Sequence, residues 1–257
     1  MKWEYKTVPD SKTVQKLAKE LNINVDLSSI LAQRGITTYQ EAKDFFRPQL
    51  ADLHDPFLMK GMGEAVDLLS NMIAGGSKML IYGDYDVDGC TSVSLVYGFL
   101  RDFTEQIEYY IPNRFKEGYG VSEQGVKYAI DHDFDLVITL DCGITAIDQI
   151  QKLKDQGIEV IVCDHHLPEH VLPNAIILNP KQALCHYPFK ELCGVGVGFK
   201  LLQGFCLQQS IELSKLFEHL DLVAMGTCAD LVSMVGENRI LTYYGLRQMN
   251  DNPSAGI

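Results

Sequence analysis

The stretch Met79-Leu80-Ile81-Tyr82 is followed at once by Gly83-Asp84-Tyr85-Asp86-Val87-Asp88-Gly89. The first four residues form a short apolar run that predicts a buried strand, and the next seven predict an acidic loop. A helical stretch then runs from Cys90 to Phe103. Strand, loop and helix in this order form the first half of a unit in which helices join parallel strands.

The same alternation of strands and helices continues along the chain to residue 178. Short apolar runs predict strands, and apolar residues at helical spacing predict the helices between them. The expected strands are Ile107–Ile111, Leu136–Leu140, Glu159–Cys163 and Ala175–Leu178, and the expected helices are Glu123–His132 and Ala146–Gln156. This pattern predicts an α/β fold with a doubly wound, mainly parallel sheet.

Both flanks of this region are predicted to be helical. On the N-terminal side, Ser11–Leu21 and Gly61–Ile73 carry apolar residues at helical spacing, and Thr38 with Glu41 forms a potential capping box. The chain from Gly194 onward is mostly helical in pattern. We therefore expect an N-terminal helical extension at residues 1–76, the main domain at 77–250 and the start of a linker at 251–257.

The composition is that of a folded globular protein. The chain has 257 residues, of which 46% are hydrophobic, and its net charge is −12. It has no apolar run of about 18 residues and no secretory signal, so we expect no membrane span and a cytoplasmic location. A protein that binds duplex DNA mainly by releasing counterions should be basic. Any nucleic-acid contact would therefore use a local groove, bound metal ions or a part missing from this chain.

The seven cysteines are an odd number and include no Cys-x-x-Cys pair, so we expect reduced thiols. Cys185, His186 and Cys193 are candidates for a zinc site, but their spacing and number fit zinc poorly. The glycine-rich stretch Gly194–Gly198 lacks the spacing of a dinucleotide-binding loop. We expect its glycines to serve close helix packing or to present backbone amides to a nucleic acid.

Acidic residues and histidines follow three successive predicted strands. Asp84, Asp86 and Asp88 follow the first, Asp141 follows Leu136–Leu140, and Asp164-His165-His166 follows Glu159–Cys163. The carboxyl ends of parallel strands meet at one edge of a sheet, where ligands bind. A further acid, Asp230, follows a helical run.

So many carboxylates in one place repel one another unless a positive charge lies between them. No basic residue lies between residues 79 and 100 to supply it. Carboxylates with an imidazole suit Mn²⁺ or Mg²⁺, and two such ions form a common site for phosphoester hydrolysis. The sequence therefore predicts a site for two Mn²⁺ or Mg²⁺ ions.

Two other interpretations of the acidic loop fit less well. An EF-hand calcium loop needs a glutamate six residues after its glycine, and Leu95 occupies that position. An aspartate after a strand is also found in haloacid-dehalogenase phosphatases. That family has no equivalent of Asp164-His165-His166, so we rank it second.

Together the four motifs resemble those of the DHH phosphoesterase superfamily. Asp164-His165-His166 matches the motif that names the superfamily, and Asp84–Gly89, Asp141-Cys142-Gly143 and Ala229-Asp230 match its other motifs. Within it, the chain is similar over its whole length to the RecJ-like family of bacterial single-stranded-DNA exonucleases. That closer resemblance also includes the stretches Asn113–Gly120 and Glu237-Asn238-Arg239.

The resemblance implies a role for each matching residue. It implies Asp141 and His166 as catalytic residues, His166 holding or protonating a phosphate oxygen, and Asp164 as a residue that orients a histidine. It implies a substrate contact at Arg114, although Arg114 could instead form an ion pair with Glu117, and we also expect substrate contacts at Tyr119, Gly194 and Gly196. The implied metal ligands are Asp84, Asp86, Asp88, Asp141, His165 and Asp230.

The implied activity is metal-dependent removal of nucleotides from the 5′ end of single-stranded DNA, in DNA repair and recombination. The implied partners are single-stranded DNA and, further, a single-strand binding protein or a helicase. Relatives continue into a DHH-associated domain and an oligonucleotide-binding fold, which we expect to be absent after Ile257. Ser233-Met234 departs from the Pro-Leu common in the family, which leaves the loop after Asp230 less well defined.

Three alternatives stay open. Other DHH enzymes hydrolyse short oligoribonucleotides, phosphoadenosine phosphate, cyclic dinucleotides or pyrophosphate. Some DHH relatives have lost metal ligands and act as scaffolds, but all the acids and both histidines are present here. The third alternative is a domain that binds metal and is nearly inactive without a second domain.

Overall fold

The computed structural model describes residue 4 and residues 6–257. The chain divides into two compact units, one ending at Asp52 and the other spanning Leu53–Ile257. The sequence analysis placed this division at residue 76. The boundary lies earlier because helix α4 (Met62–Ala74) packs on α8 (Gly194–Gln208) and therefore belongs to the second unit.

In its described residues, the first unit contains three α-helices and a short 3₁₀ helix. They are α1 (Ser11–Leu21), α2 (Val25–Gln33), α3 (Tyr39–Phe46) and η1 (Leu50–Asp52). The predicted capping box of α3 is confirmed, because Thr38 and Glu41 accept hydrogen bonds from each other's backbone amides. Four buried apolar residues form the core of this unit: Leu17, Leu31, Ile36 and Ala42.

The second unit contains a five-stranded parallel sheet with the strand order β2-β1-β3-β4-β5. This order and direction confirm the predicted doubly wound parallel sheet. From β1, the chain adds β2 on one side and β3, β4 and β5 on the other, so the strand order reverses at β1. Ligands bind at such a reversal point in folds of this kind. The strands are β1 (Met79–Gly83), β2 (Ile107–Tyr110), β3 (Leu136–Leu140), β4 (Glu159–Cys163) and β5 (Ile176–Leu178).

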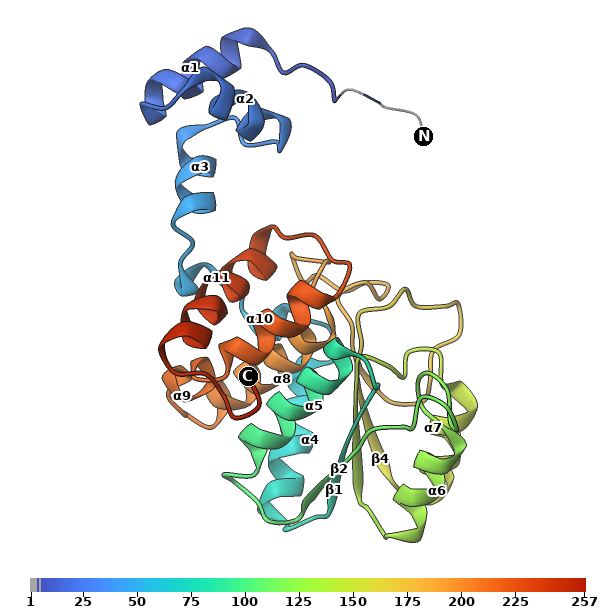
Figure 1. The fold of residues 1–257 in the computed structure, drawn as a ribbon. Helices are drawn as coiled ribbons and strands as arrows, with labels where there is room; N and C mark the ends of the chain where they lie inside the picture. The colour runs from blue at the N-terminus through green and yellow to red at the C-terminus, as the bar shows by residue number, and fades with distance from the viewer. Residues whose placement is uncertain (1–3, 5) are drawn as a thin grey trace. The chain divides into compact units, whose positions relative to one another are not determined.

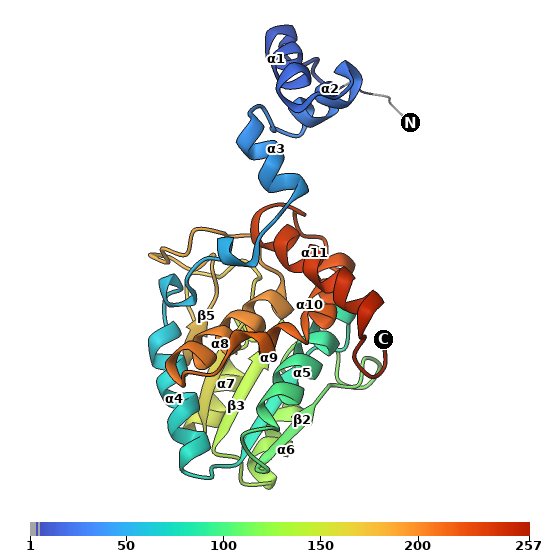
Figure 2. The same ribbon diagram turned by 90° about the vertical axis from the view of Figure 1, so that its left-hand side faces the viewer.

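Helices cover both faces of the sheet, so its central strands are buried throughout (Figure 1). One face carries α6 (Glu123–Asp131) and α7 (Ile147–Asp155), which pack over Leu80, Val137 and Val160. The other face carries α4, α5 (Val87–Leu100) and α8, toward the viewer in Figure 2. The remaining elements are η2 (Pro56–Leu58), α9 (Leu213–Phe217), α10 (Leu220–Ala229) and α11 (Gly236–Asp251).

Residues 251–257 were expected as the start of a linker, but Asp251 is the last residue of α11 and the segment after it contacts α10. Ser254 donates from its backbone amide and its hydroxyl to the buried carboxylate of Asp221. Among the described residues, no helix combines the length and apolar character needed to cross a membrane.

Candidate metal centre

The register of the sheet brings three acids to one edge. Gly83 at the end of β1 is paired with Leu140 of β3, and Leu140 is paired with Cys163 of β4. The next residue along each strand therefore lies in the same row. These residues are Asp84, Asp141 and Asp164, and all three side chains are buried.

The first turn of α5 supplies two more acids. Asp86 is the N-cap of this helix, and its Oδ1 accepts from the backbone amide of Gly89 at 2.9 Å. The helix thus begins at Val87, three residues before the predicted start at Cys90. An aspartate at the N-cap satisfies an amide of the first turn, and this converts the end of the acidic loop into helix. The N–H of Gly89 is therefore already engaged by the side chain of Asp86.

Asp88 is held by the start of α8. Its Oδ2 accepts from the amide of Gly194 at 2.6 Å and its Oδ1 from the amide of Val195 at 2.8 Å. A Cβ atom on Gly194 would lie 2.5 Å from the Cβ atom of Asp141. Only glycine fits between the two acids, so Gly194 shapes the site. Gly196, by contrast, packs beside Leu192.

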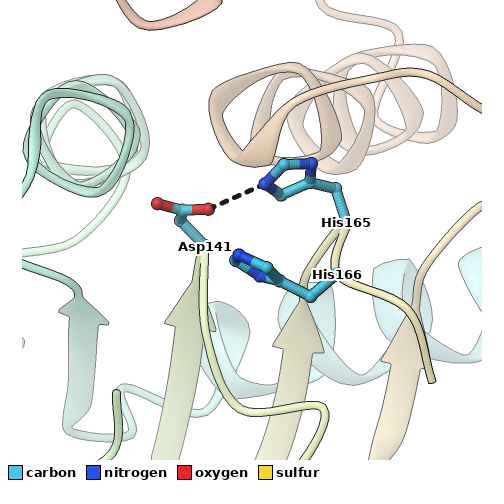
Figure 3. Close-up of side chains that lie close together, drawn as sticks. All are labelled: Asp141, His165 and His166. Atoms are coloured by element: carbon cyan, nitrogen blue, oxygen red, sulfur yellow. Dashed lines mark ion pairs between the residues drawn. The ribbon is translucent and has the colours of Figure 1, made fainter. Parts of the chain in front are cut away.

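Asp141 and His165 meet at the centre of the site. The backbone of Asp141 has a φ of 58°, a left-handed conformation that aspartate tolerates better than most residues. In Figure 3 both imidazole rings extend from the loop after β4 toward Asp141, and Nε2 of His165 lies 3.2 Å from Oδ1 of Asp141. The same Nε2 lies 3.6 Å from Oδ2 of Asp230 and 3.9 Å from Oδ2 of Asp88.

Two groups of potential ligand atoms result. Asp88, His165 and Asp230 form one, and Asp141, His165 and His166 form the other, with the ligand atoms of each group within 4.8 Å of one another. Asp84 and Asp86 belong to neither group. The zinc alternative fails, since among the described residues Cys185, His186 and Cys193 form no such group and all seven cysteines are free thiols.

Several buried atoms at this edge lack a hydrogen-bond partner. They are Oδ2 of Asp84, Oδ1 of Asp141, Nδ1 of His165 and Oδ2 of Asp230. Burial also raises the pKa values of Asp84, Asp88 and Asp141, and repulsion from neighbouring carboxylates adds to each shift. Burial lowers the pKa of His165 and so favours its neutral imidazole. Buried polar atoms are normally satisfied, so these atoms indicate a missing positive ligand.

Asp164 and His166 form a separate pair beside these atoms. Oδ1 of Asp164 lies 2.7 Å from Nδ1 of His166, and its Oδ2 accepts from the amide of Ile144. Burial alone would raise the pKa of Asp164, but the hydrogen bonds and charge of His166 lower it. The hydrogen bond that Nδ1 of His166 donates to Asp164 in turn raises the pKa of His166. The far nitrogen, Nε2, lies 3.1 Å from the hydroxyl of Tyr119.

Arg114, predicted as a substrate contact with an ion pair to Glu117 as the alternative, makes neither that ion pair nor one with any other carboxylate among the described residues. Its guanidinium lies over the ring of Tyr85, 5.1 Å from the ring centre. Glu117 instead accepts from the hydroxyls of Tyr110 and Ser122 and from the amide of Asn113. The alternative Arg114–Glu117 ion pair is therefore absent among the described residues.

A cavity of about 350 Å³ adjoins His166, and neither His165 nor Asp88 lines it. It is lined by Tyr119, Val121, Ile144, Ala146, Gln149 and His166, among others. This volume falls at the small end of the range for ligand pockets. The sequence analysis missed Gln149, because a glutamine on an amphipathic helix carries no distinguishing pattern.

The sequence analysis also missed Asn179. This buried residue follows β5 and donates to the carbonyl of His166 at 2.9 Å, so it fixes the backbone of the histidine loop. The rule that found the acids, a polar residue directly after a buried strand, would have found Asn179 as well.

Comparison with known proteins places the chain in a family. Residues 78–227, more than half of the chain, match the model described as DHH family, N-terminal domain. The chain is 42% identical over 258 residues to the single-stranded-DNA-specific exonuclease RecJ of Bacillus subtilis (strain 168). That match covers 100% of this chain and 32% of the relative, so the chain spans about a third of its length.

Other relatives agree. The chain is 37% identical to RecJ of Escherichia coli (strain K12) over 234 residues, which cover 87% of this chain and 40% of the relative. The crystal structure of RecJ from Thermus thermophilus in complex with Mn²⁺ matches with a TM-score of 0.78 and 28% identity, over 94% of this chain and 34% of that one. The motifs, the sheet and these matches agree that the chain belongs to the DHH family.

Proposed function

We propose that this chain is the catalytic domain of a metal-dependent exonuclease that removes nucleotides from the 5′ end of single-stranded DNA. The observation that carries the proposal is the set of buried, unpartnered ligand atoms at the strand ends. Among them, the carboxylates of Asp84 and Asp141 have raised pKa values, as expected where negative charges are buried together without a counter-charge.

The donor set fits Mn²⁺ or Mg²⁺. Carboxylate oxygens with one imidazole suit these ions, and no thiol belongs to either group of ligand atoms among the described residues. Asp88, His165 and Asp230 would hold one ion. Asp141, whose group of ligand atoms has His165 in common with the first group, would hold the second ion, with Asp84 and Asp86 nearby. Bound ions of this kind act as Lewis acids on a phosphate and lower the pKa of water.

His166 is better suited to carrying a proton than to binding metal. Its Nδ1 is engaged by Asp164, its pKa is raised by that hydrogen bond, and its ring is partly exposed. A proton at Nε2 can therefore be donated in a hydrogen bond to a phosphate oxygen as negative charge develops there. Tyr119 lies against the same nitrogen and fixes the direction of that donor.

Two features support a single-stranded nucleic acid as the substrate. The relatives are named single-stranded-DNA-specific exonucleases. The cavity beside His166 offers apolar walls at Val121 and Ile144 and an amide at Gln149, which suit the flat faces and polar edge of a nucleobase. A helicase or a single-strand binding protein as a partner belongs to the same proposal, because either one handles unpaired strands.

The test is a substrate panel. End-labelled single-stranded DNA, the same DNA as a duplex, short RNA and a cyclic dinucleotide are each incubated with Mn²⁺ and with chelator. We expect Mn²⁺-dependent shortening of single-stranded DNA from its 5′ end. Faster turnover of RNA or the cyclic dinucleotide would favour another DHH phosphodiesterase instead. Metal binding without turnover of any substrate would favour a domain that needs a second domain.

A binding measurement separates metal from activity. Mn²⁺ should raise the melting temperature, because it relieves carboxylate repulsion only in the folded state. The matched control is Asp141→Asn, which keeps the size of the side chain and removes its charge. An unchanged wild-type melting curve in millimolar Mn²⁺ would contradict the proposed metal centre.

A further inference from the structure

The first turn of α11 lies outside the groups of ligand atoms but carries two buried polar residues. Glu237 and Asn238 have exposed fractions of 1% and 0%. A buried polar side chain is costly unless it makes hydrogen bonds, so its partners indicate its role. The partners of Asn238 lie in two loops that lead to the metal centre.

The amide nitrogen of Asn238 donates to two backbone carbonyls. One belongs to Glu191, three residues before Gly194, whose N–H holds Asp88. The other belongs to Ser233, at 3.0 Å, three residues after Asp230. One side chain therefore joins the segment that binds Asp88 to the segment that carries Asp230.

The same two segments also meet closer to the site. Sγ of Cys193 lies 3.2 Å from Oγ1 of Thr227, which joins the N-cap of α8 to α10. A Cβ atom on Gly226 of α10 would lie 3.0 Å from Oδ1 of Asp88. The carboxylates of Asp88 and Asp230 thus depend on how the start of α8 and the end of α10 sit against each other.

Glu237 holds the first turn of α11 in place. Its carboxylate pairs with Nζ of Lys200 at 2.6 Å and accepts from the hydroxyl of Tyr187 at 2.6 Å and from the amide of His54 at 3.0 Å. These partners come from α8, the loop before it and the segment before η2. The adjacent residue, Asn238, is therefore presented from a rigid support.

We propose that Asn238 is a positioning residue for the metal centre, because its amide holds the Glu191 and Ser233 loops so that Asp88 and Asp230 face His165. The inference rests on the proposed function. Leu231, next to Asp230, is fully exposed, so the loop at residues 231–235 has little packing of its own at that end. Without the amide of Asn238, the loop would hold Asp230 less firmly. Loss of a group that orients metal ligands typically costs about 10–100-fold in metal affinity.

The test measures Mn²⁺ binding in Asn238→Ala and Asn238→Leu, the second of which keeps the side-chain volume. Binding is followed by the loss of the free Mn²⁺ electron paramagnetic resonance signal, together with urea unfolding. We expect the Mn²⁺ concentration for half-saturation to rise about 10-fold, at the lower end of that range. Excess Mn²⁺ should restore turnover toward the wild-type rate. The matched control is Thr242→Val, also buried on α11, which should leave Mn²⁺ binding unchanged.

Two results would overturn the inference. In one, an Asn238 variant is less stable in urea but binds Mn²⁺ with wild-type affinity. In the other, neither variant folds, so that the hydrogen bonds serve the fold and not the site. If the wild-type protein binds no Mn²⁺, the proposed function fails as well. That outcome is distinguishable, because it does not depend on any Asn238 variant.

Discussion

The unit at Leu53–Ile257 contains two clusters of buried charge, and the two are balanced differently. In one cluster, Nζ of Lys200 lies 2.6 Å from the carboxylate of Glu237. Both oxygens of that carboxylate also accept hydrogen bonds, one from the hydroxyl of Tyr187 and one from the amide of His54. In the cluster around Asp141 and His165, carboxylates gather without a buried lysine or arginine, and several of their atoms have no partner.

This difference distinguishes a buried charge cluster that stabilises the fold from one that can bind a ligand. A buried charge must be compensated, and the Lys200 cluster is compensated by the chain itself. The cluster at the strand ends has no such compensation from the chain, which supports the proposal that a cation binds there. Both clusters are buried, so burial alone would not have shown which one binds a ligand. The atoms left without partners make that distinction.

The largest expected effect is the loss of turnover in Asp141→Ala. Removing the Asp141 carboxylate, which lies 3.2 Å from the His165 nitrogen common to both groups of ligand atoms, should lower kcat by at least roughly 10³-fold, or about 4 kcal/mol. Because one repelling charge is gone, the metal-free variant should unfold at a higher urea concentration than the metal-free wild type. Measured turnover near the wild-type rate would break the comparison, since the unpartnered atoms would then have no role in catalysis.

The next effect concerns the compensated cluster. Lys200→Met leaves Glu237 buried without its cation, which should cost about 3–4 kcal/mol in the free energy of unfolding. The double variant with Glu237→Gln, whose amide oxygen still accepts from Tyr187, should recover most of the loss. Urea unfolding measures both variants. Equal losses in the single and double variants would show that the pair contributes through packing alone.

The third effect is on rate alone. His166→Ala should lower kcat by about 10²-fold, or about 2.7 kcal/mol, because the proton donor at Nε2 is lost. Mn²⁺ binding should persist, because Asp141 and His165 remain. A titration of Mn²⁺ against the melting temperature tests this point. If the variant fails to bind Mn²⁺, His166 is a ligand and the roles assigned to the two histidines are reversed.

The smallest effect is a pH dependence, at most about 1.4 kcal/mol per pH unit. The folded protein raises the pKa of Asp141 above its ordinary value of 3.8, so this residue adds stability at low pH and loses it as pH rises. Without metal, the unfolding free energy of the wild type should fall relative to Asp141→Asn between about pH 5 and about pH 8. Added Mn²⁺ should remove the decline. If the difference in unfolding free energy between the two proteins stays constant with pH, the pKa of Asp141 is not raised by folding.

Much of the sheet could be predicted because its strands are buried on both faces. Such strands are continuous apolar runs, and β3 and β4 begin and end at the predicted residues. The acids could be predicted by their position directly after those runs. The boundary at residue 52 could not, because α4 has the same helical pattern whether it packs in a separate unit or against α8.

The chain's own sequence determined the parallel sheet, the capping box of α3 and the order in which acids and histidines follow the strands. These features depend on neighbouring residues and on the regular spacing of apolar side chains. The tertiary structure decided that Gly194 holds Asp88, that Tyr119 meets His166 and that Asn238 joins two loops. Each of these contacts joins residues that are distant in sequence, and only the packing of α8, α10 and α11 against the sheet brings them within hydrogen-bond distance.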